Sequence, residues 1–258
     1  MIFVLLGLGL ALLLFGGMLG FLGLGRRLGT RALARAPSEG PTGTGPLEAA
    51  VFGTLGLLIA FTFGGAISRF ETRRDLIVQE ANALGTLWLR LDLLPTKEQA
   101  PIRELVRRYV DARLDAYGKF PDLDAAKEGL AHAVEVQGEL WTATVETLKG
   151  MGPSAPTPSI LIPLNEVIDL ATTRTEVMRR HQPPLVFAML FALAFGAALM
   201  AGYGLARSKD RSWFHRLAFA GVTAIAVYVI MDIEFPRVGL IRVDAADQVL
   251  VDLRATMK

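Results

Sequence analysis

The chain has 258 residues, of which 52% are hydrophobic and 20% are charged, and its formal net charge is only +2 at pH 7. A soluble domain of ordinary composition carries fewer apolar residues and more charge. Because the chain has no cysteine, disulfides, thiol catalysis and thiolate metal sites are excluded. Its basic residues lack the aromatic-basic pattern of a nucleic-acid surface, so we expect no nucleic-acid partner.

The charged residues are concentrated between four long apolar windows, which indicates a protein that crosses the membrane four times. Residues 1–24 form the first window. A cleaved signal peptide has its positive charges before the apolar stretch, whereas here four arginines follow it. We therefore predict a retained transmembrane helix over residues 1–24, followed by a basic, Gly- and Pro-rich loop over residues 25–46.

The second predicted span, residues 47–67, continues into charged sequence with no proline and no turn cluster between them. Beyond Ser68, apolar residues recur at three- and four-residue steps as far as Leu91, which predicts one face of a helix. Pro95 ends this pattern. At about 1.5 Å per residue the whole helix would be roughly 70 Å long, more than twice the thickness of the hydrocarbon core. We expect it to project far into water.

The remaining apolar stripes complete an all-α fold: four transmembrane helices with a four-helix aqueous domain inserted between spans two and three. Pro121 and Asp122 supply a helix stop and an N-cap within this domain. The predicted boundaries are residues 68–183 for the helical aqueous domain, 184–206 for the third span, 207–216 for a basic loop, 217–235 for the fourth span and 236–258 for a short amphipathic tail.

The side of the membrane on which the helical domain lies stays open. Both short loops are basic, which by the positive-inside rule places them in the cytoplasm and the helical domain outside. The arginines that flank the spans on the opposite side are nearly as numerous as the basic residues of the two short loops.

No enzyme motif is present. His132, His181 and His215 lie on separate segments without metal-ligand spacing, and no glycine-rich phosphate loop follows a strand. We therefore expect no catalytic residue, metal or cofactor.

Charged residues gather where the second and fourth spans end on the domain side. They are Arg69, Glu71, Arg73, Arg74, Asp232, Glu234 and Arg237. Ionisable residues near a span are costly and usually pair or line a water path. We predict that Asp232 or Glu234 pairs with Arg69 or Arg73. This cluster could be an ion-pair clasp that fixes the helices or a charged ring at a pore mouth, and the two roles are compatible in an oligomer.

A second polar cluster lies farther along the same helix, with partners on the last helix of the aqueous domain. Its members are Glu80, Asn82, Arg90, Asp92, Asn165, Asp169 and Arg174. One interpretation is a buried hydrogen-bond network that holds the helical bundle together. The alternative is a ligand or ion site.

One face of the second span carries Leu57, Phe61 and Ser68, together with Gly65 or its neighbour Gly64. Apolar and aromatic rings of this kind can gate a channel by dewetting. The same pattern also serves ordinary helix packing.

Several segments carry a family resemblance. They are residues 56–63, 68–74, 80–86, 89–95 and 233–240. The most specific stretches are Glu-Ala-Asn-Ala at residues 80–83 and Glu-Phe-Pro-Arg at residues 234–237. Along nearly its whole length the chain resembles the bacterial bestrophin-like family of membrane proteins.

The bestrophins to which this family is similar are pentameric anion channels with four spans per subunit and a helical domain between the second and third. Their second span lines a hydrophobic neck. The resemblance implies a homo-oligomer, pentameric as in bestrophins, in the bacterial inner membrane, with the lipid bilayer and small inorganic ions as partners. Phe61 is a position similar to the neck.

Two departures from the bestrophins matter. The sequence has no acidic calcium clasp, and the tail after Pro236 is too short to supply one. The large domain of bestrophins is cytoplasmic, opposite to the side that the positive-inside rule favours here. We expect an oligomeric pore for small anions; the alternative is a non-conducting membrane sensor or assembly protein whose helical domain binds a ligand or a protein.

Overall fold

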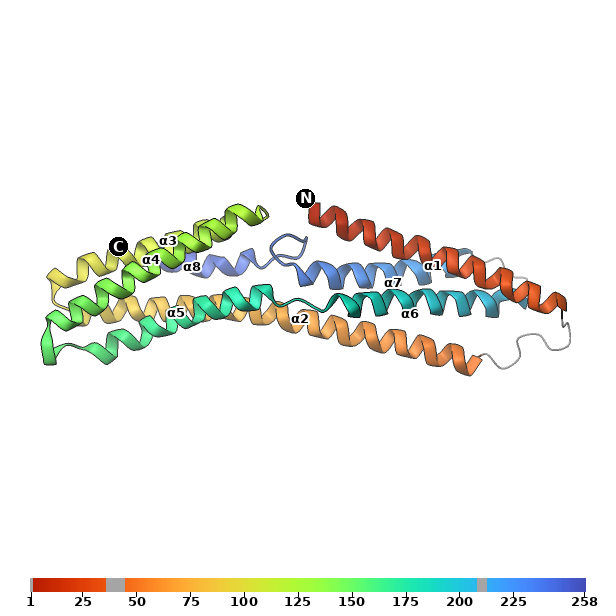
Figure 1. Ribbon diagram of the computed structural model, residues 1–258, viewed down its shortest axis with the longest axis horizontal. Coiled ribbons are helices and arrows are strands. Elements are labelled where there is room, and N and C mark those ends of the chain that lie inside the picture. The colour runs from red at the N-terminus through yellow and green to blue at the C-terminus, as the bar shows by residue number, and fades with distance from the viewer. Residues whose placement is uncertain (1, 36–44, 208–212) are drawn as a thin grey trace. The chain divides into compact units, whose positions relative to one another are not determined.

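The computed structural model describes residues 2–35, 45–207 and 213–258. Over these residues the chain is helical and contains no strand, so the predicted all-α class is confirmed (Figure 1). Four stretches of helix are long and apolar enough to cross a membrane. Residues 36–44 and 208–212, which belong to the two predicted basic loops, lie outside the described residues.

Eight α-helices follow one another in the described ranges. They are α1 (Ile2–Arg35), α2 (Gly45–Arg90), α3 (Thr96–Gly118), α4 (Leu123–Gly150), α5 (Thr157–Arg179), α6 (Pro184–Gly204), α7 (Trp213–Glu234) and α8 (Asp244–Thr256). Short 3-10 turns follow three of them: η1 (Leu91–Leu93), η2 (Gly152–Ser154) and η3 (Leu205–Arg207). Helix α2 confirms the continuous helix predicted from the second span into charged sequence, but it ends at Arg90, and the 3-10 turn η1 follows before Pro95.

The chain divides into two compact units. Unit 1 comprises Met1–Ser68, His181–Phe235 and Gly239–Ile241, and unit 2 comprises Arg69–Arg180, Pro236–Val238 and Arg242–Lys258. Helix α2 therefore contributes its first part to unit 1 and its second part to unit 2.

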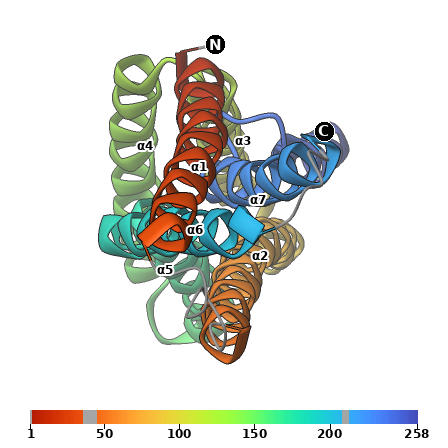
Figure 2. The same ribbon diagram turned by 90° about the vertical axis from the view of Figure 1, so that its right-hand side faces the viewer.

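Unit 1 is built around α1, which packs against α6 and α7 (Figures 1 and 2). Its core combines large side chains of α1 mainly with alanines of α6 and α7, which lets the backbones approach closely. The core residues are Leu14, Met18, Leu22, Leu55, Ala194, Ala197, Ala198, Ala220, Ala224 and Val227.

Helix α1 extends to Arg35, whereas the sequence pattern predicts its end at Leu24. The reason is close packing against α6. A Cβ atom on Gly25 would collide with the carbonyl oxygen of Leu199, and one on Gly29 would lie 2.7 Å from the carbonyl oxygen of Tyr203. Glycines four residues apart allow two helix backbones to touch. This contact keeps the arginine-rich sequence helical beyond the apolar window.

Unit 2 packs the second part of α2 with α3, α4, α5 and α8 around one apolar core. Its fully buried members include Leu84, Leu87, Leu91, Ile102, Val106, Val110, Leu140, Ile160, Leu164, Val167 and Leu250. The predicted N-cap of α4 is confirmed, because the Asp122 carboxylate accepts a hydrogen bond from the Ala125 N–H at 3.1 Å.

Helix α5 begins at Thr157, six residues earlier than the sequence pattern predicts, and Pro163 lies inside it. A proline within a helix leaves the carbonyl four residues before it without its usual donor. Here that carbonyl belongs to Ser159, and it accepts a hydrogen bond from Nη1 of Arg90 at 3.2 Å. The guanidinium of α2 thus replaces the missing N–H and allows the helix to pass through the proline.

Candidate functional site

The predicted pore-lining residues lie on the first part of α2, within unit 1. Leu57 is 56% exposed and Phe61 is 70% exposed. Ser68 and Gly64 are also exposed, while Gly65 is half-buried, so Gly64 shares the exposed face more fully than Gly65. The opposite face is buried and includes Leu55, Thr62 and Ala66. The structure therefore brings the predicted stripe onto one uncovered face of the helix.

This α2 face differs in composition from the exposed face of α1. Small residues separate its two large ones, since Gly53, Ala60 and Gly64 are exposed beside Leu57 and Phe61. The exposed large residues in the first half of α1 are mostly leucines: Leu5, Leu6, Leu8, Leu10, Leu12 and Leu13. Interfaces between helices in a membrane are enriched in small residues. The α2 face is thus suited to contact with another helix, and the α1 face is suited to lipid.

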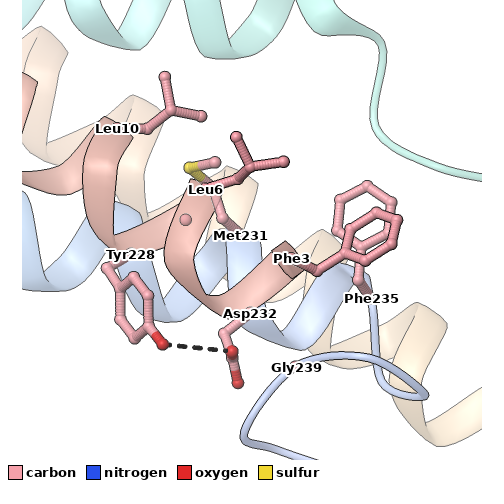
Figure 3. Close-up of a pocket in the computed structure, with 9 residues that line it drawn as sticks. Phe3, Leu6, Leu10, Tyr228, Met231, Asp232, Phe235 and Gly239 are labelled. Atoms are coloured by element: carbon pink, nitrogen blue, oxygen red, sulfur yellow. Dashed lines mark hydrogen bonds between the residues drawn. The ribbon is translucent and has the colours of Figure 1, made fainter. Parts of the chain in front are cut away.

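Asp232, near the end of α7, holds the loop that follows this helix. Its carboxylate accepts hydrogen bonds from the N–H groups of Leu240 at 2.8 Å and Ile241 at 2.7 Å. The Tyr228 hydroxyl lies 3.5 Å from the same carboxylate (Figure 3). Gly239 is required here, because a Cβ atom on it would lie 2.7 Å from Oδ1 of Asp232. Peptide N–H groups therefore stabilise the negative charge of this aspartate.

An apolar cavity of about 170 Å³ adjoins this loop (Figure 3). It lies between the start of α1 and the end of α7, and its lining comprises Phe3, Leu6, Gly7, Leu10, Tyr228, Met231, Asp232, Phe235 and Gly239.

Glu234 holds the segment that leads into α6. It accepts a hydrogen bond from the Gln182 N–H at 2.8 Å, and Nδ1 of His181 lies 3.6 Å away. The His181 ring stacks on Phe235 with 4.6 Å between the ring centroids. The pairing of these carboxylates with Arg69 or Arg73 stays a prediction.

The other members of the membrane-border cluster take different positions within unit 2. Arg73 donates a hydrogen bond to the carbonyl oxygen of Arg180 at 2.7 Å. Glu71 and Arg74 are exposed, and Arg74 lines a groove between α2 and α8. Arg237 is buried and binds Asp247, with 3.0 Å between Nη2 and Oδ1.

A buried ionic network lies at the centre of unit 2. Glu80 of α2 is fully buried and accepts hydrogen bonds from Nε of Arg113 at 2.9 Å and from Arg174. The Tyr109 hydroxyl is a third partner and donates a hydrogen bond at 3.3 Å. Burial alone would raise the pKa of Glu80, but the charges of Arg174 and Arg113 outweigh burial and lower it. The carboxyl group is therefore ionised, with two guanidinium partners.

The network continues through Tyr117 to α8. The guanidinium carbons of Arg174, Arg237 and Arg113 lie 4.4, 4.6 and 5.0 Å from the centroid of the Tyr117 ring. Asp247 of α8 binds Arg237 and lies 3.6 Å from Nη2 of Arg174. Hydrogen bonds to Asp247 and the charge of this carboxylate raise the pKa of Arg237 against the lowering effect of burial. The network links α2, α3, α5 and α8.

Of the seven residues in the predicted polar cluster, the structure brings Glu80 and Arg174 together. Arg90 binds Ser159, and Asp92 pairs with Arg103. The remaining three are exposed: Asn82, Asn165 and Asp169.

The sequence interpretation did not include Arg113, although a signal for it exists. Tyr109, Arg113 and Tyr117 follow one another at four-residue steps on the buried face of α3. An arginine in such a stripe requires a buried acid, because an unpaired buried charge is very costly. Asp247 gave no comparable signal, since it belongs to a separate helix of alternating polarity.

Within residues 2–35, 45–207 and 213–258, no group of three or more His, Asp or Glu side chains is placed to hold a metal ion.

Comparison with known proteins identifies the class. The family model of the bestrophin-like domain matches residues 12–247, so the chain belongs to the bestrophin-like family. The resemblance read from the sequence is thereby confirmed. The chain is also similar to the crystal structure of a mutant bacterial bestrophin homologue from Klebsiella pneumoniae, with a TM-score of 0.60 and 14% sequence identity. The match covers 93% of this chain and 98% of the homologue, and it shows a shared fold. No curated protein matches the sequence.

Proposed function

We propose that this membrane protein forms a homo-oligomeric, channel-like pore lined by the exposed face of α2. The observation that carries the proposal is the contrast between the two exposed faces of unit 1. The α2 face interleaves small residues with Leu57 and Phe61, while the first half of α1 exposes six leucines, with Gly9 and Gly16 as its small exposed residues. Helices that surround an axis approach one another through small residues, whereas large aliphatic side chains dominate the exposed first half of α1.

Leu57 and Phe61 supply the narrow part of this pore. Copies of these side chains around an axis form apolar rings, which gate a channel by excluding water when the rings are close together. Ser68, about two turns beyond Phe61 on the same face, provides a hydroxyl at the end of the apolar section.

Small inorganic anions are the ions that suit this arrangement. Three arginines follow directly after the apolar section of α2: Arg69, Arg73 and Arg74. Positive charge beside a pore mouth raises the local concentration of anions. The carboxylate of Asp232 is stabilised by the N–H groups of Leu240 and Ile241, which reduces its effect on a passing anion. By family, we assign the protein to the inner membrane of a bacterium, as a pentamer and not as an enzyme.

Ion flux from reconstituted vesicles tests this proposal. The full chain is placed in vesicles loaded with chloride, and chloride release is recorded for the wild type, Phe61→Ala and Phe63→Ala. Phe63 is the matched control, because it is 38% exposed but lies on another side of the same helix. We expect release in the wild type and a several-fold increase in Phe61→Ala, because the apolar ring is widened.

Equal rates in the two phenylalanine variants would contradict the assignment of α2 as the lining. A correctly assembled protein that releases no ion in any variant would support the other class, a non-conducting sensor or assembly protein.

A further inference from the structure

The last three turns of α1 form a basic surface at one end of unit 1. Arg26, Arg27, Arg31 and Arg35 lie there, and α1 contains no acidic residue. Because α1 is helical through Arg35, these arginines hold fixed positions on a helix that emerges from the apolar window. The carboxylate of Glu48, on α2, lies beside Gly204 of α6.

Arginines and leucines alternate on one face of this end of α1. Leu24 is 45% exposed and Leu28 is 42% exposed. Arg27, Arg31 and Arg35 are also exposed. Residues three and four apart on a helix are neighbours on its surface. The face therefore presents a strip of apolar contact with guanidinium groups directly beside it.

Aromatic residues of α7 lie at the level of this strip. The helices α1 and α7 are antiparallel (Figure 1). A Cβ atom on Gly7 would lie 3.3 Å from the Tyr228 ring, and one on Gly221 would lie 3.9 Å from the Phe15 ring. Continued along the helix axes, this register puts the start of α7 at the level of residues 21–24 of α1.

Two aromatic side chains at the start of α7 are therefore level with the end of the apolar section of α1. Trp213 is 69% exposed and Phe214 is 65% exposed. Exposed aromatic residues at the end of a span mark the boundary between hydrocarbon and headgroups. Arg27 and Arg31 follow one to two turns beyond this level, which is the depth of the phosphate groups.

We propose that this end of α1 binds an anionic phospholipid. Arg27 and Arg31, one turn apart, donate forked hydrogen bonds to its phosphate oxygens, a geometry that guanidinium groups favour. Its acyl chains lie along Leu24 and Leu28. Charge complementarity selects an anionic lipid over a zwitterionic one, because the arginines face no carboxylate on their own helix. The site is independent of ion conduction.

Quenching of Trp213 fluorescence by brominated lipids measures this preference. The full chain is reconstituted into phosphatidylcholine vesicles in which a set fraction of the lipid is brominated phosphatidylglycerol or brominated phosphatidylcholine. Bromine quenches tryptophan only at contact, and the signal that Trp213→Phe removes belongs to Trp213. Each arginine near an anionic surface favours binding by about fivefold, so phosphatidylglycerol should quench Trp213 several-fold more effectively at equal fraction.

Variants assign the preference to the two arginines. The double variant Arg27→Gln and Arg31→Gln should remove the preference for phosphatidylglycerol. The double variant Arg27→Lys and Arg31→Lys should retain part of the preference, because lysine keeps the charge but cannot form the two-pronged hydrogen bonds of a guanidinium group. Arg108→Gln, which alters an exposed arginine of unit 2, is the control and should leave it unchanged. Circular dichroism and assembly size establish that each variant is folded.

Equal quenching of wild-type Trp213 by the two lipids would overturn the proposal. The proposal would also be overturned if the folded double variant Arg27→Gln and Arg31→Gln kept the full preference for phosphatidylglycerol.

Discussion

Glu80 of α2 and Arg113 of α3 form a buried two-pronged ion pair, in which Nε lies 2.9 Å from Oε1 and Nη2 lies 3.0 Å from Oε2. Their side chains are 0% and 3% exposed. Removing two charges from water is costly, and the cost is offset only where hydrogen bonds satisfy both groups. Arg174 and Tyr109 complete the set of partners around the carboxylate.

Glu80→Gln should therefore lower the free energy of unfolding by about 3–5 kcal/mol, because it leaves Arg113 buried without its counter-charge. Thermal unfolding of the full chain in detergent measures the loss. Glu139→Gln is the control: Glu139 is half-exposed and pairs with Arg108, and such surface changes stay within about 0.5 kcal/mol. Equal losses of stability in the two variants would show that the buried pair contributes no more to the free energy of unfolding than the exposed pair does.

The same pair predicts a dependence on pH. The pKa of Glu80 is lower in the folded protein than in the unfolded chain. The contribution of Glu80 to the free energy of unfolding is therefore complete above its unfolded-state pKa, about 4.3. This contribution is lost as the pH falls through the folded-state pKa. The difference in melting temperature between the wild type and Glu80→Gln should narrow as the pH is lowered from 7 through this range. A constant difference would contradict the lowered pKa.

Gly202→Ala tests the contact between α1 and α6. A Cβ atom at this position would collide with the carbonyl oxygen of Leu22, and overpacking of this kind costs about 1–3 kcal/mol. Gly196→Ala on the same helix meets nothing within 4 Å. It should be neutral or stabilising by up to about 1 kcal/mol, since alanine favours a helix more than glycine. An equal decrease in melting temperature for Gly202→Ala and Gly196→Ala would contradict the close packing of α1 on α6.

A double-mutant cycle tests the role of Arg90 in completing α5. Arg90→Ala should cost about 1 kcal/mol, because the Ser159 carbonyl loses its donor. On a Pro163→Ala background the same change should cost less, since the backbone N–H of the new residue can bond to that carbonyl. Stabilities come from urea unfolding of each variant. Strictly additive effects would refute the compensation.

The sequence pattern predicted the features that depend on local periodicity. The apolar face and the uninterrupted charged continuation of α2 follow from spacing alone, as does the N-cap at Asp122. It missed the end of α1, because glycine and arginine after Leu24 are typical of a loop and the contact that keeps them helical comes from α6.

Part of the candidate site could be predicted, and part depends on tertiary structure. Glu80 and Arg174 stood out as polar residues on faces that pack together. The partners of Asp232 are peptide N–H groups at Leu240 and Ile241, which no side-chain pattern reveals. Arg113 could have been found from its place between Tyr109 and Tyr117 on the buried stripe of α3.

Distances between subunits at residue 61 test the central claim, that the exposed face of α2 lines a shared axis. Because the chain has no cysteine, Phe61→Cys gives a single site for a spin label, and Leu13→Cys, on the exposed face of α1, gives the matched outer site. Pulsed electron paramagnetic resonance on the assembled protein should show shorter inter-subunit distances at residue 61 than at residue 13. Distances at residue 61 that equal or exceed those at residue 13, or no inter-subunit signal at all, would contradict the account.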